Sequence, residues 1–358
     1  MRIVITGASG NVGTAVLRAL RRADPGHELV GVVRRPPATE GDYRDMTWHA
    51  VDLTQDRARG QLTGIFAGAD AVIHLAWGFQ PTRNTEYLTR LGVGGTQSVL
   101  DAAHRAQVPH LVHMSSVGTY APGRYGERVD ESWSTTGVRT SPYSRDKSAA
   151  EALLDDYERD NADGGVLITR ARPGFIVQRA AASGLMRYGL PAWMPMRVLP
   201  LLPVLPLDRG LCIPLIHADD VASALVAVVH RRARGAFNLA GEPPLDRDTV
   251  AKVLGAKAIQ VPSGLLGTAV DLSWRARLQP IDRGWLDLAF SVPLLDTGRA
   301  RRELEWAPQW SATDALADVL AGVSEGAHTV SPPLRRRSVL EQLVRDLTAG
   351  QVTTRRVP

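Results

Sequence analysis

The sequence predicts an α/β fold in which a doubly wound parallel sheet carries a smaller, interleaved lobe toward the C-terminal end. In the first half of the chain, short apolar runs typical of buried strands alternate with amphipathic helical patterns. A glycine-rich turn joins the first of these runs to the first helical pattern. After residue 175 the pattern changes, and prolines stand between large apolar residues. We therefore expect one sheet-based domain and a second part of different construction.

The composition is ordinary for a globular protein and narrows the possible partners. The 358 residues are 44% hydrophobic and 22% charged with a net charge of +5, enough for one large domain or two intimate ones. No basic stripe with a reading element is present, so nucleic acid is not an expected partner. The single cysteine, Cys212, excludes an intrachain disulfide and favours a reducing, cytoplasmic location. Because Met1 and Arg2 lead directly into an apolar strand, no signal peptide is expected. Prolines break the apolar region 185–216, so no membrane span is expected either.

The predicted elements alternate along the chain. The strands are 2–6, 28–33, 47–51, 71–75, 109–114, 166–170, 211–216 and 235–239. The helices run to about residue 22, over 54–67, over 91–106, from 142 onward, and through residue 229. The last two strands are expected to return to the main sheet. The predicted domains are a sheet domain of 1–174 with returning segments at about 211–240, a lobe of 175–210 and 241–330, and a basic tail of 331–358 with a short helix near 338–347.

The glycine-rich turn, G-A-S-G-N-V-G over residues 7–13, follows a strand and opens a helix, as in a Rossmann-type dinucleotide-binding domain. Gly7 permits a tight turn, Gly10 lets the backbone approach a pyrophosphate, and Gly13 allows the helix to pack closely on the strand. The phosphates would lie at the helix N-terminus.

The end of the second predicted strand indicates which dinucleotide is bound. An acidic residue there would favour NAD(H), but the chain has Arg34 and Arg35. A guanidinium pairs with a 2′-phosphate in a forked geometry, so we expect NADP(H) rather than NAD(H). In the alternative interpretation, both arginines are solvated loop charges. Asp52, after the third strand, fits a cap of the helix predicted over 54–67.

Ser116, Tyr143 and Lys147 form a candidate catalytic set. Ser116 ends a buried strand, and the spacing of Tyr143 and Lys147 places both on one face of a helix. A lysine one turn away lowers the pKa of a phenol, and a serine hydroxyl holds a substrate oxygen against it. Alternatively, the lysine lies beside a half-buried ring and the serine caps local backbone.

The motifs resemble the extended short-chain dehydrogenase/reductase superfamily, which includes NAD-dependent epimerases and dehydratases, over residues 1 to about 325. They are, in order, T-G-x-x-G-x-x-G from Thr6, H-L-A from His74, S-S-V-G-T-Y from Ser115, S-P-Y-x-x-x-K from Ser141, R-P-G from Arg172 and H-A-D-D-V-A from His217. The resemblance implies that Tyr143 is the general acid/base, that Lys147 holds the nicotinamide ribose and lowers the phenol pKa, and that Ser116 orients the substrate oxygen. The implied cofactor-binding residues are Gly7, Ser9, Gly10, Asn11, Val12, Gly13, Arg34, Arg35, Asp52, Leu53, Leu75, Ala76, Lys147 and Pro173. Gly92 departs from the pattern, because the family usually has an asparagine there that carries a water-linked proton path behind the lysine.

The second half of the chain indicates the substrate. Its large apolar residues suit a hydrophobic molecule better than a diphosphate sugar, although Arg187 and Arg197 are available for a diphosphate. Alternatively, these apolar residues are only a lobe core or a dimer contact. Sugar 4,6-dehydratases carry an Asp-Glu pair after the hydroxyl residue, whereas Ser116 is followed by Val117 and Gly118.

These observations favour an NADP(H)-dependent oxidoreductase that transfers hydride at a carbonyl or secondary alcohol of a hydrophobic small molecule. The alternatives are a nucleotide-sugar epimerase that retains its cofactor and a non-catalytic NADP-binding sensor protein. No metal site is expected. Family members commonly dimerise through the helices that begin near Leu91 and Tyr143, so the resemblance implies a homodimer.

Overall fold

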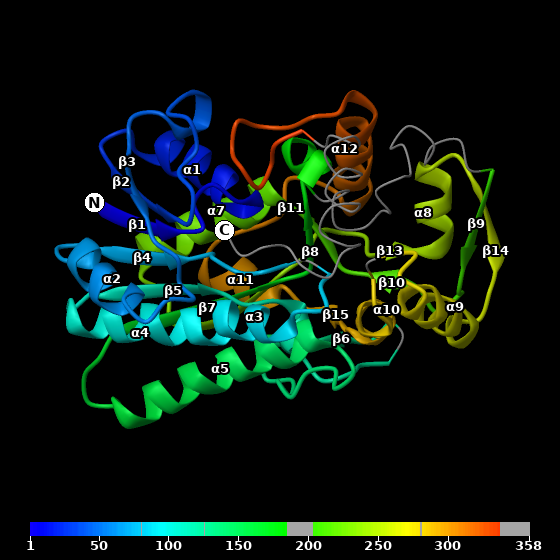
Figure 1. Cartoon of the computed structure of the whole chain (residues 1–358), viewed down its shortest axis with the longest axis horizontal. Coiled ribbons are helices and arrows are strands. Elements are labelled where there is room, and N and C mark those ends of the chain that lie inside the picture. Colours follow the sequence, from blue (N-terminus) through cyan, green and yellow to red (C-terminus); the bar gives the residue numbers. More distant parts are fainter. Residues whose placement is uncertain (80, 125, 185–202, 280, 337–358) are drawn as a thin grey trace.

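The computed structural model describes residues 1–336 apart from 80, 125, 185–202 and 280 (Figure 1). Its centre is a sheet of seven parallel strands in the order β12-β7-β5-β4-β1-β2-β3. Their bounds are Arg2–Thr6 (β1), Glu28–Val33 (β2), Thr47–Ala50 (β3), Ala71–His74 (β4), His110–Met114 (β5), Leu167–Pro173 (β7) and Gly235–Leu239 (β12). The predicted doubly wound α/β fold is confirmed, and each of these strands lies close to a predicted one.

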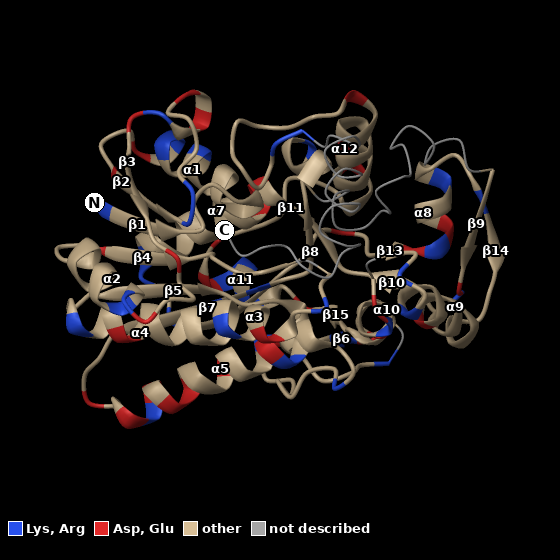
Figure 2. Cartoon of the chain, in the orientation of Figure 1, with Lys and Arg blue, Asp and Glu red and all other residues tan. Residues whose placement is uncertain are grey.

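Helices cover both faces of the sheet because side chains alternate along each strand. Ile3 and Ile5 of β1 pack on one face with Leu17 and Leu225, whereas Val4 packs on the other with Leu100. The first face carries α1 (Asn11–Ala23), α7 (Ala218–Arg231) and α11 (Gly298–Glu303). The second carries α2 (Ala58–Phe66), α4 (Gly95–Arg105) and α5 (Pro142–Asp160). Acidic and basic residues are mixed along α5 rather than separated by sign (Figure 2).

Two predicted helices begin elsewhere in the structure. The helix expected from residue 54 begins at Ala58, because the Asp52 carboxylate accepts hydrogen bonds from the backbone and hydroxyl of Thr54 and holds a turn there. The helix expected from 91 begins earlier, since α3 (Thr85–Thr89) continues through a π-helical turn (Arg90–Gly94) into α4.

The prediction of one main-sheet strand at 211–216 is wrong. The segment forms β10 (Cys212–Ile213), which pairs antiparallel with β13 (Leu245–Asp246), and β11 (Leu215–His217), which pairs with β8 (Phe175–Val177). Pro214 separates the two strands because it has no N–H to donate to a ladder. Its carbonyl accepts a hydrogen bond from Phe175 N at 2.7 Å. Of the two strands predicted to return, only 235–239 joins the main sheet, as β12.

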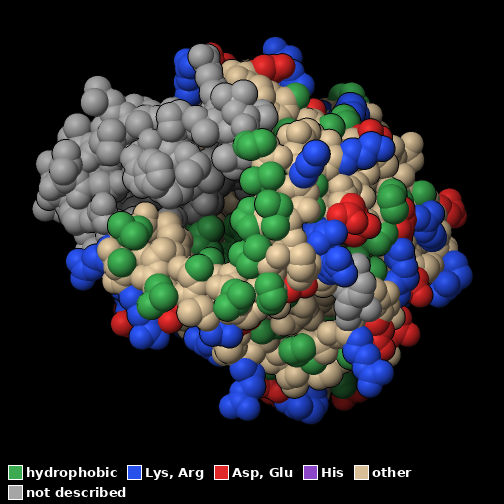
Figure 3. All heavy atoms as spheres, turned by 90° about the vertical axis from the view of Figure 1, so that its right-hand side faces the viewer, with side chains coloured by type: hydrophobic (Ala, Val, Ile, Leu, Met, Phe, Trp, Pro, Cys, Tyr) green, Lys and Arg blue, Asp and Glu red, His purple; other side chains and the backbone are tan. Residues whose placement is uncertain are grey.

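The smaller lobe lies beside the carboxyl end of the sheet (Figure 1). It contains β9 (Val204–Leu207) paired with β14 (Lys257–Gln260), together with α8 (Arg247–Val253), α9 (Ser263–Arg275) and α10 (Arg283–Ser291). Nearby, β15 (Leu294–Leu295) pairs with β6 (Arg128–Val129), and α12 (Ala312–Glu325) packs on β11. On the side of this lobe, hydrophobic side chains surround a hollow (Figure 3). Arg187, Arg197 and the helix predicted near 338–347 lie outside the described residues.

Among the described residues, no helix is both long and apolar enough to cross a membrane. The same part of the chain holds no group of three His, Cys, Asp or Glu side chains arranged to bind a metal ion.

Candidate active site

A cavity of about 1130 Å³ lies at the carboxyl edge of the parallel sheet, where β1, β4, β5 and β7 end. In doubly wound sheets this edge is where ligands bind. Every site residue predicted from the sequence lines this cavity: Gly7, Ser9, Gly10, Asn11, Val12, Gly13, Arg34, Arg35, Asp52, Leu53, Leu75, Ala76, Ser116, Tyr143, Lys147 and Pro173. Residues from seven separate stretches of sequence are thus brought to one place.

The glycine-rich turn is shaped as a cradle that side chains would fill. Gly7 has a φ of +73°, and a Cβ there would lie 2.7 Å from the backbone nitrogen of Ala76. A Cβ at Gly13 would lie 2.4 Å from the carbonyl oxygen of Ala8. Within the described part of the chain, no side chain caps the N-terminus of α1, so its first N–H groups are available to an anion. This geometry fits the pyrophosphate of a dinucleotide.

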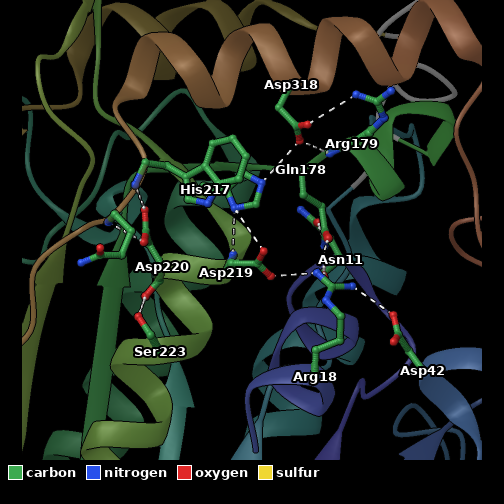
Figure 4. A network of polar contacts seen from close by, with 12 residues as sticks. Asn11, Arg18, Asp42, Gln178, Arg179, His217, Asp219, Asp220, Ser223 and Asp318 are labelled. Carbon is green, nitrogen blue, oxygen red and sulfur yellow. Dashed lines mark hydrogen bonds and ion pairs between the residues drawn. The ribbon is translucent and has the colours of Figure 1, made fainter. Parts of the chain in front are cut away.

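A polar network holds this turn against the C-terminal part of the chain (Figure 4). The Gln178 amide donates to the backbone carbonyl and side chain of Asn11 at 2.6 and 2.8 Å. Arg18 of α1 donates to Gln178 at 2.9 Å and forms an ion pair of 2.8 Å with Asp219 at the start of α7. His217, next along the network, lies 3.4 Å from Asp318 of α12. The phosphate cradle is therefore braced by elements from distant parts of the sequence.

The adenosine side of the cavity carries the two predicted arginines, Arg34 and Arg35. Arg34 Nη1 donates to the hydroxyl of Tyr87 at 2.6 Å. Tyr87 belongs to α3, which the sequence did not predict. Asp52 lines the cavity and at the same time holds its own turn through Thr54, so both roles considered for it are compatible.

Ser116, Tyr143 and Lys147 are brought together at the opposite side of the cavity. Ser116 Oγ accepts a hydrogen bond from Gly118 N at 3.0 Å, and Gly118 lies against the Tyr143 ring. Tyr143 and Lys147 lie in the first two turns of α5, which begins at Pro142 with Ser141 as its N-cap. Lys147 Nζ donates to the Met114 carbonyl at 2.8 Å.

The electrostatics differ from the sequence-based expectation that Lys147 lowers the pKa of Tyr143. Burial raises the pKa of Tyr143 to about 12, and its hydrogen bond with Ser116 only partly opposes this. Burial likewise lowers the pKa of Lys147 well below its usual range, while Glu151 and Asp146 raise it. Desolvation dominates because both groups are buried among aromatic rings, which disfavour the charged form of each.

A buried ion pair fixes α5 to the sheet. Glu151 has an exposed fraction of 0% and accepts two hydrogen bonds from Arg172 of β7, at 2.8 and 2.7 Å. The hydroxyl of Ser115, at the end of β5, also donates to Glu151. Because Glu151 lies one turn beyond Lys147, these bonds set the position of Tyr143 and Lys147 relative to Ser116.

Trp77 occupies the place where the family asparagine would extend. A Cβ at Gly92 would lie 2.8 Å from the Trp77 ring, so the indole fills the space beside that position. The same ring lies 3.4 Å from Lys147 Nζ, in a cation–π contact. The departure at Gly92 thus makes room for an aromatic ring that contacts the lysine.

Aromatic rings also enclose Tyr143. Trp285 of α10 stacks on it with a centroid separation of 5.5 Å, and Phe79 meets it edge-on at 5.2 Å. Phe79 also meets Trp285 edge-on at 4.8 Å. Sequence reasoning missed Trp77, Phe79 and Trp285 as site residues. Trp77 and Phe79 could have been found, because they closely follow the H-L-A segment, which ends at the predicted ligand edge of the sheet. Trp285 could not, because it comes from a helix distant in sequence.

Comparisons with known proteins agree with this geometry. The model of the NAD dependent epimerase/dehydratase family matches residues 3–240. The dTDP-glucose 4,6-dehydratase of Streptomyces griseus is 25% identical over 339 residues, covering 89% of this chain and 93% of the relative. An uncharacterized protein of Mycobacterium tuberculosis is 26% identical over 345 residues, covering 95% of this chain and 32% of the relative. The chain therefore spans about a third of the length of the mycobacterial relatives it matches.

A solved structure shares the fold. The UDP-glucose 4-epimerase of Thermotoga maritima, determined with UDP-glucose, superposes with a TM-score of 0.69 at 15% identity, covering 91% of this chain and 99% of that chain. Since the family match extends over most of the sheet domain and includes the glycine-rich turn and the Tyr143–Lys147 pair, the chain belongs to the NAD-dependent epimerase/dehydratase family of extended short-chain dehydrogenases/reductases.

Proposed function

We propose that the chain is an NADP(H)-dependent oxidoreductase that acts on a carbonyl or secondary alcohol of a hydrophobic small molecule. The observation that carries this proposal is the aromatic surround of Tyr143, formed by Trp77, Phe79 and Trp285. Phe175 and Leu288 extend the apolar lining of the cavity beside these rings. An apolar group of the substrate would lie against these surfaces with its oxygen directed to the phenol.

The dinucleotide would be held by the residues that line the other side of the cavity. The glycine-rich turn and the N-terminus of α1 would bind the pyrophosphate, and Arg34 with Arg35 would bind a 2′-phosphate. Lys147 donates one N–H to Met114 and keeps others for a ribose hydroxyl. When bound, a reduced nicotinamide supplies the hydride that the substrate carbon accepts.

Tyr143 acts as a general acid in the reducing direction. A pKa raised to about 12 keeps its phenol protonated at neutral pH, so the phenol donates its proton as the carbonyl oxygen gains charge. Ser116 Oγ accepts from Gly118, and its O–H, which bonds with the Tyr143 hydroxyl, would turn to donate to the same substrate oxygen when substrate is bound. The carbon–oxygen π bond breaks, and one C–H and one O–H bond form.

A nucleotide-sugar epimerase is the second candidate, and the relatives favour it. The Thermotoga maritima neighbour is a UDP-glucose 4-epimerase. A sugar diphosphate needs cations on the substrate side of the cavity. The cationic side chains among the described lining residues are Arg34 and Arg35 at the end of β2, Arg335 after α12, and Lys147, which the mechanism assigns to the cofactor ribose. Dehydration is not proposed, since Val117 and Gly118 stand where the dehydratases carry their acids.

We further propose a homodimer formed through the helical face of α4 and α5, which lie side by side (Figure 1). The family resemblance implies the homodimer, and the single cysteine favours a cytoplasmic location. Measurement of the molecular mass in solution tests the homodimer.

Calorimetric titration with NADPH and NADH, followed by turnover of a panel of aromatic ketones, tests the function. We expect tighter binding of NADPH and stoichiometric loss of reduced nicotinamide absorbance with a ketone. Conversion of a nucleotide sugar without net cofactor consumption would instead establish the epimerase. Dinucleotide binding without turnover of either substrate class would favour the sensor protein.

A further inference from the structure

The chain after α12 returns to the glycine-rich turn. Figure 1 shows this segment running from α12 back toward α1. Four of its residues, Pro332 to Arg335, line the same cavity as the turn. The matched family model ends at residue 240, so nothing in that match accounts for this contribution.

Hydrogen bonds fasten the segment to the cofactor side of the cavity. The Ser331 hydroxyl donates to the backbone carbonyl of Ser9, inside the glycine-rich turn, at 2.5 Å. Two residues earlier, Thr329 bonds with the Tyr43 hydroxyl at 2.9 Å, and that hydroxyl also bonds with Thr14 of α1 at 2.9 Å. Ser331 is completely buried.

The segment also has a defined shape of its own. Leu334 N donates to the Ser331 carbonyl at 3.0 Å, and Thr329 N donates to the Leu334 carbonyl at 3.1 Å. Pro332 and Pro333 stand inside this turn and restrict its backbone. Leu334 is 4% exposed, whereas the next residue, Arg335, is exposed at the cavity.

We propose that residues 329–335 form a strap over the pyrophosphate of the bound dinucleotide and that Arg335 pairs with one of its phosphate oxygens. The Ser331–Leu334 turn is fixed on Ser9 of the glycine-rich turn, and Arg335 is the next residue along the chain. The backbone that carries Arg335 is therefore anchored to the phosphate cradle. A guanidinium reaches phosphate oxygens through forked, charge-assisted hydrogen bonds. The proposal rests on the proposed dinucleotide site and adds a binding residue to it.

The strap has a kinetic consequence. A dinucleotide beneath it leaves only when the Arg335 contact is broken, so the strap slows release more than it changes association. Charge neutralisation by Arg335 also makes release depend on salt concentration.

Stopped-flow displacement of NADPH by excess NADP⁺ from the full chain tests the proposal. We expect Arg335→Gln to release NADPH about tenfold faster and with a weaker salt dependence, as loss of one charge-assisted contact implies. Arg336→Gln is the matched control, because it removes the same charge from the adjacent residue, which does not line the cavity. It should release NADPH at the unmodified rate.

Ser331→Ala provides a second, independent variant. It removes the anchor on Ser9 and keeps Arg335, and its release should also be faster, with thermal unfolding confirming that it is folded. Release from Arg335→Gln at the unmodified rate overturns the strap while leaving the dinucleotide site standing. Failure of the unmodified chain to bind either dinucleotide overturns the dinucleotide site and the strap together.

Discussion

The two halves of the cavity are built by different means. The cofactor half, comprising residues 7–13, Arg34, Arg35 and Asp52, consists of backbone and charged groups placed directly after β1, β2 and β3. The aromatic half, comprising Trp77, Phe79, Tyr143, Phe175 and Leu288, draws rings and apolar side chains from a loop, α5, β8 and α10. Local turn geometry shapes the first half, which distant segments then brace, whereas packing between distant segments shapes the second half itself.

This difference separates what binds a common cofactor from what selects a substrate. A phosphate cradle needs free N–H groups and close backbone packing, which Gly7 and Gly13 allow at the two ends of one seven-residue turn. The aromatic half needs only surfaces of suitable shape, and many sequences provide them. Changes in one half should therefore leave the other half's function intact, and the following variants test this separation.

The largest effect is expected from Tyr143→Phe, which removes the proton donor and keeps the ring in place. We expect kcat to fall by about 10²- to 10⁴-fold with ketone substrates, as loss of a general acid implies. The affinity for NADPH should remain unchanged, because the phenol belongs to the aromatic half. Steady-state kinetics and calorimetry measure the two quantities.

Tyr157→Phe is the control for this prediction. It makes the same change on the same helix, where the Tyr157 hydroxyl bonds with His104 outside the main cavity. Full activity in Tyr143→Phe would refute the acid role, and a parallel loss of NADPH affinity would show that the two halves are coupled.

A smaller effect is expected from Arg34→Gln, which alters only the cofactor half. NADPH affinity should weaken by about 10- to 100-fold, because a forked guanidinium–phosphate pair is lost, while NADH affinity stays the same. Calorimetric titration with both dinucleotides gives the ratio directly. Arg105→Gln, at the exposed end of α4, serves as a control of equal charge. An equal loss of NADH affinity would show that Arg34 does not recognise the 2′-phosphate and has a structural role, such as holding Tyr87.

The smallest effect is expected from Phe79→Ala in the aromatic half. Loss of one apolar surface should raise KM for aromatic ketones by about tenfold, equivalent to about 1.4 kcal/mol, with little change in kcat. Leu265→Ala, which truncates a 64% exposed apolar residue outside the cavity, is the control. An unchanged KM together with weaker NADPH binding would show that Phe79 acts in the cofactor half and not in the aromatic half.

Sequence reasoning reached the cofactor half more completely than the aromatic half. The positions of Gly7, Gly13 and Tyr143 were accessible because local spacing and the end of a strand determine where they lie. Trp285 was not accessible, because its contact with Tyr143 joins residues far apart in the chain. The raised pKa of Tyr143 escaped prediction for a related reason: the spacing to Lys147 reveals a neighbouring charge but says nothing of desolvation.

The fold shows the same division. Strands with uninterrupted apolar runs were predicted nearly to the residue, whereas the run 211–216 was misassigned because Pro214 ends one pairing and begins another. The helix that begins at Thr85 was missed in part because a π-helical turn interrupts its regular period.

The contact between Trp77 and Gly92 restricts the order in which this chain can evolve. A side chain at position 92 collides with the indole at 2.8 Å, so an asparagine is acceptable there only after Trp77 has been replaced by a smaller residue. The reverse holds for an ancestor with the asparagine, which must lose it before gaining the tryptophan. The two positions are therefore epistatic, and homologues should carry a large residue at one of them or at the other, but not at both.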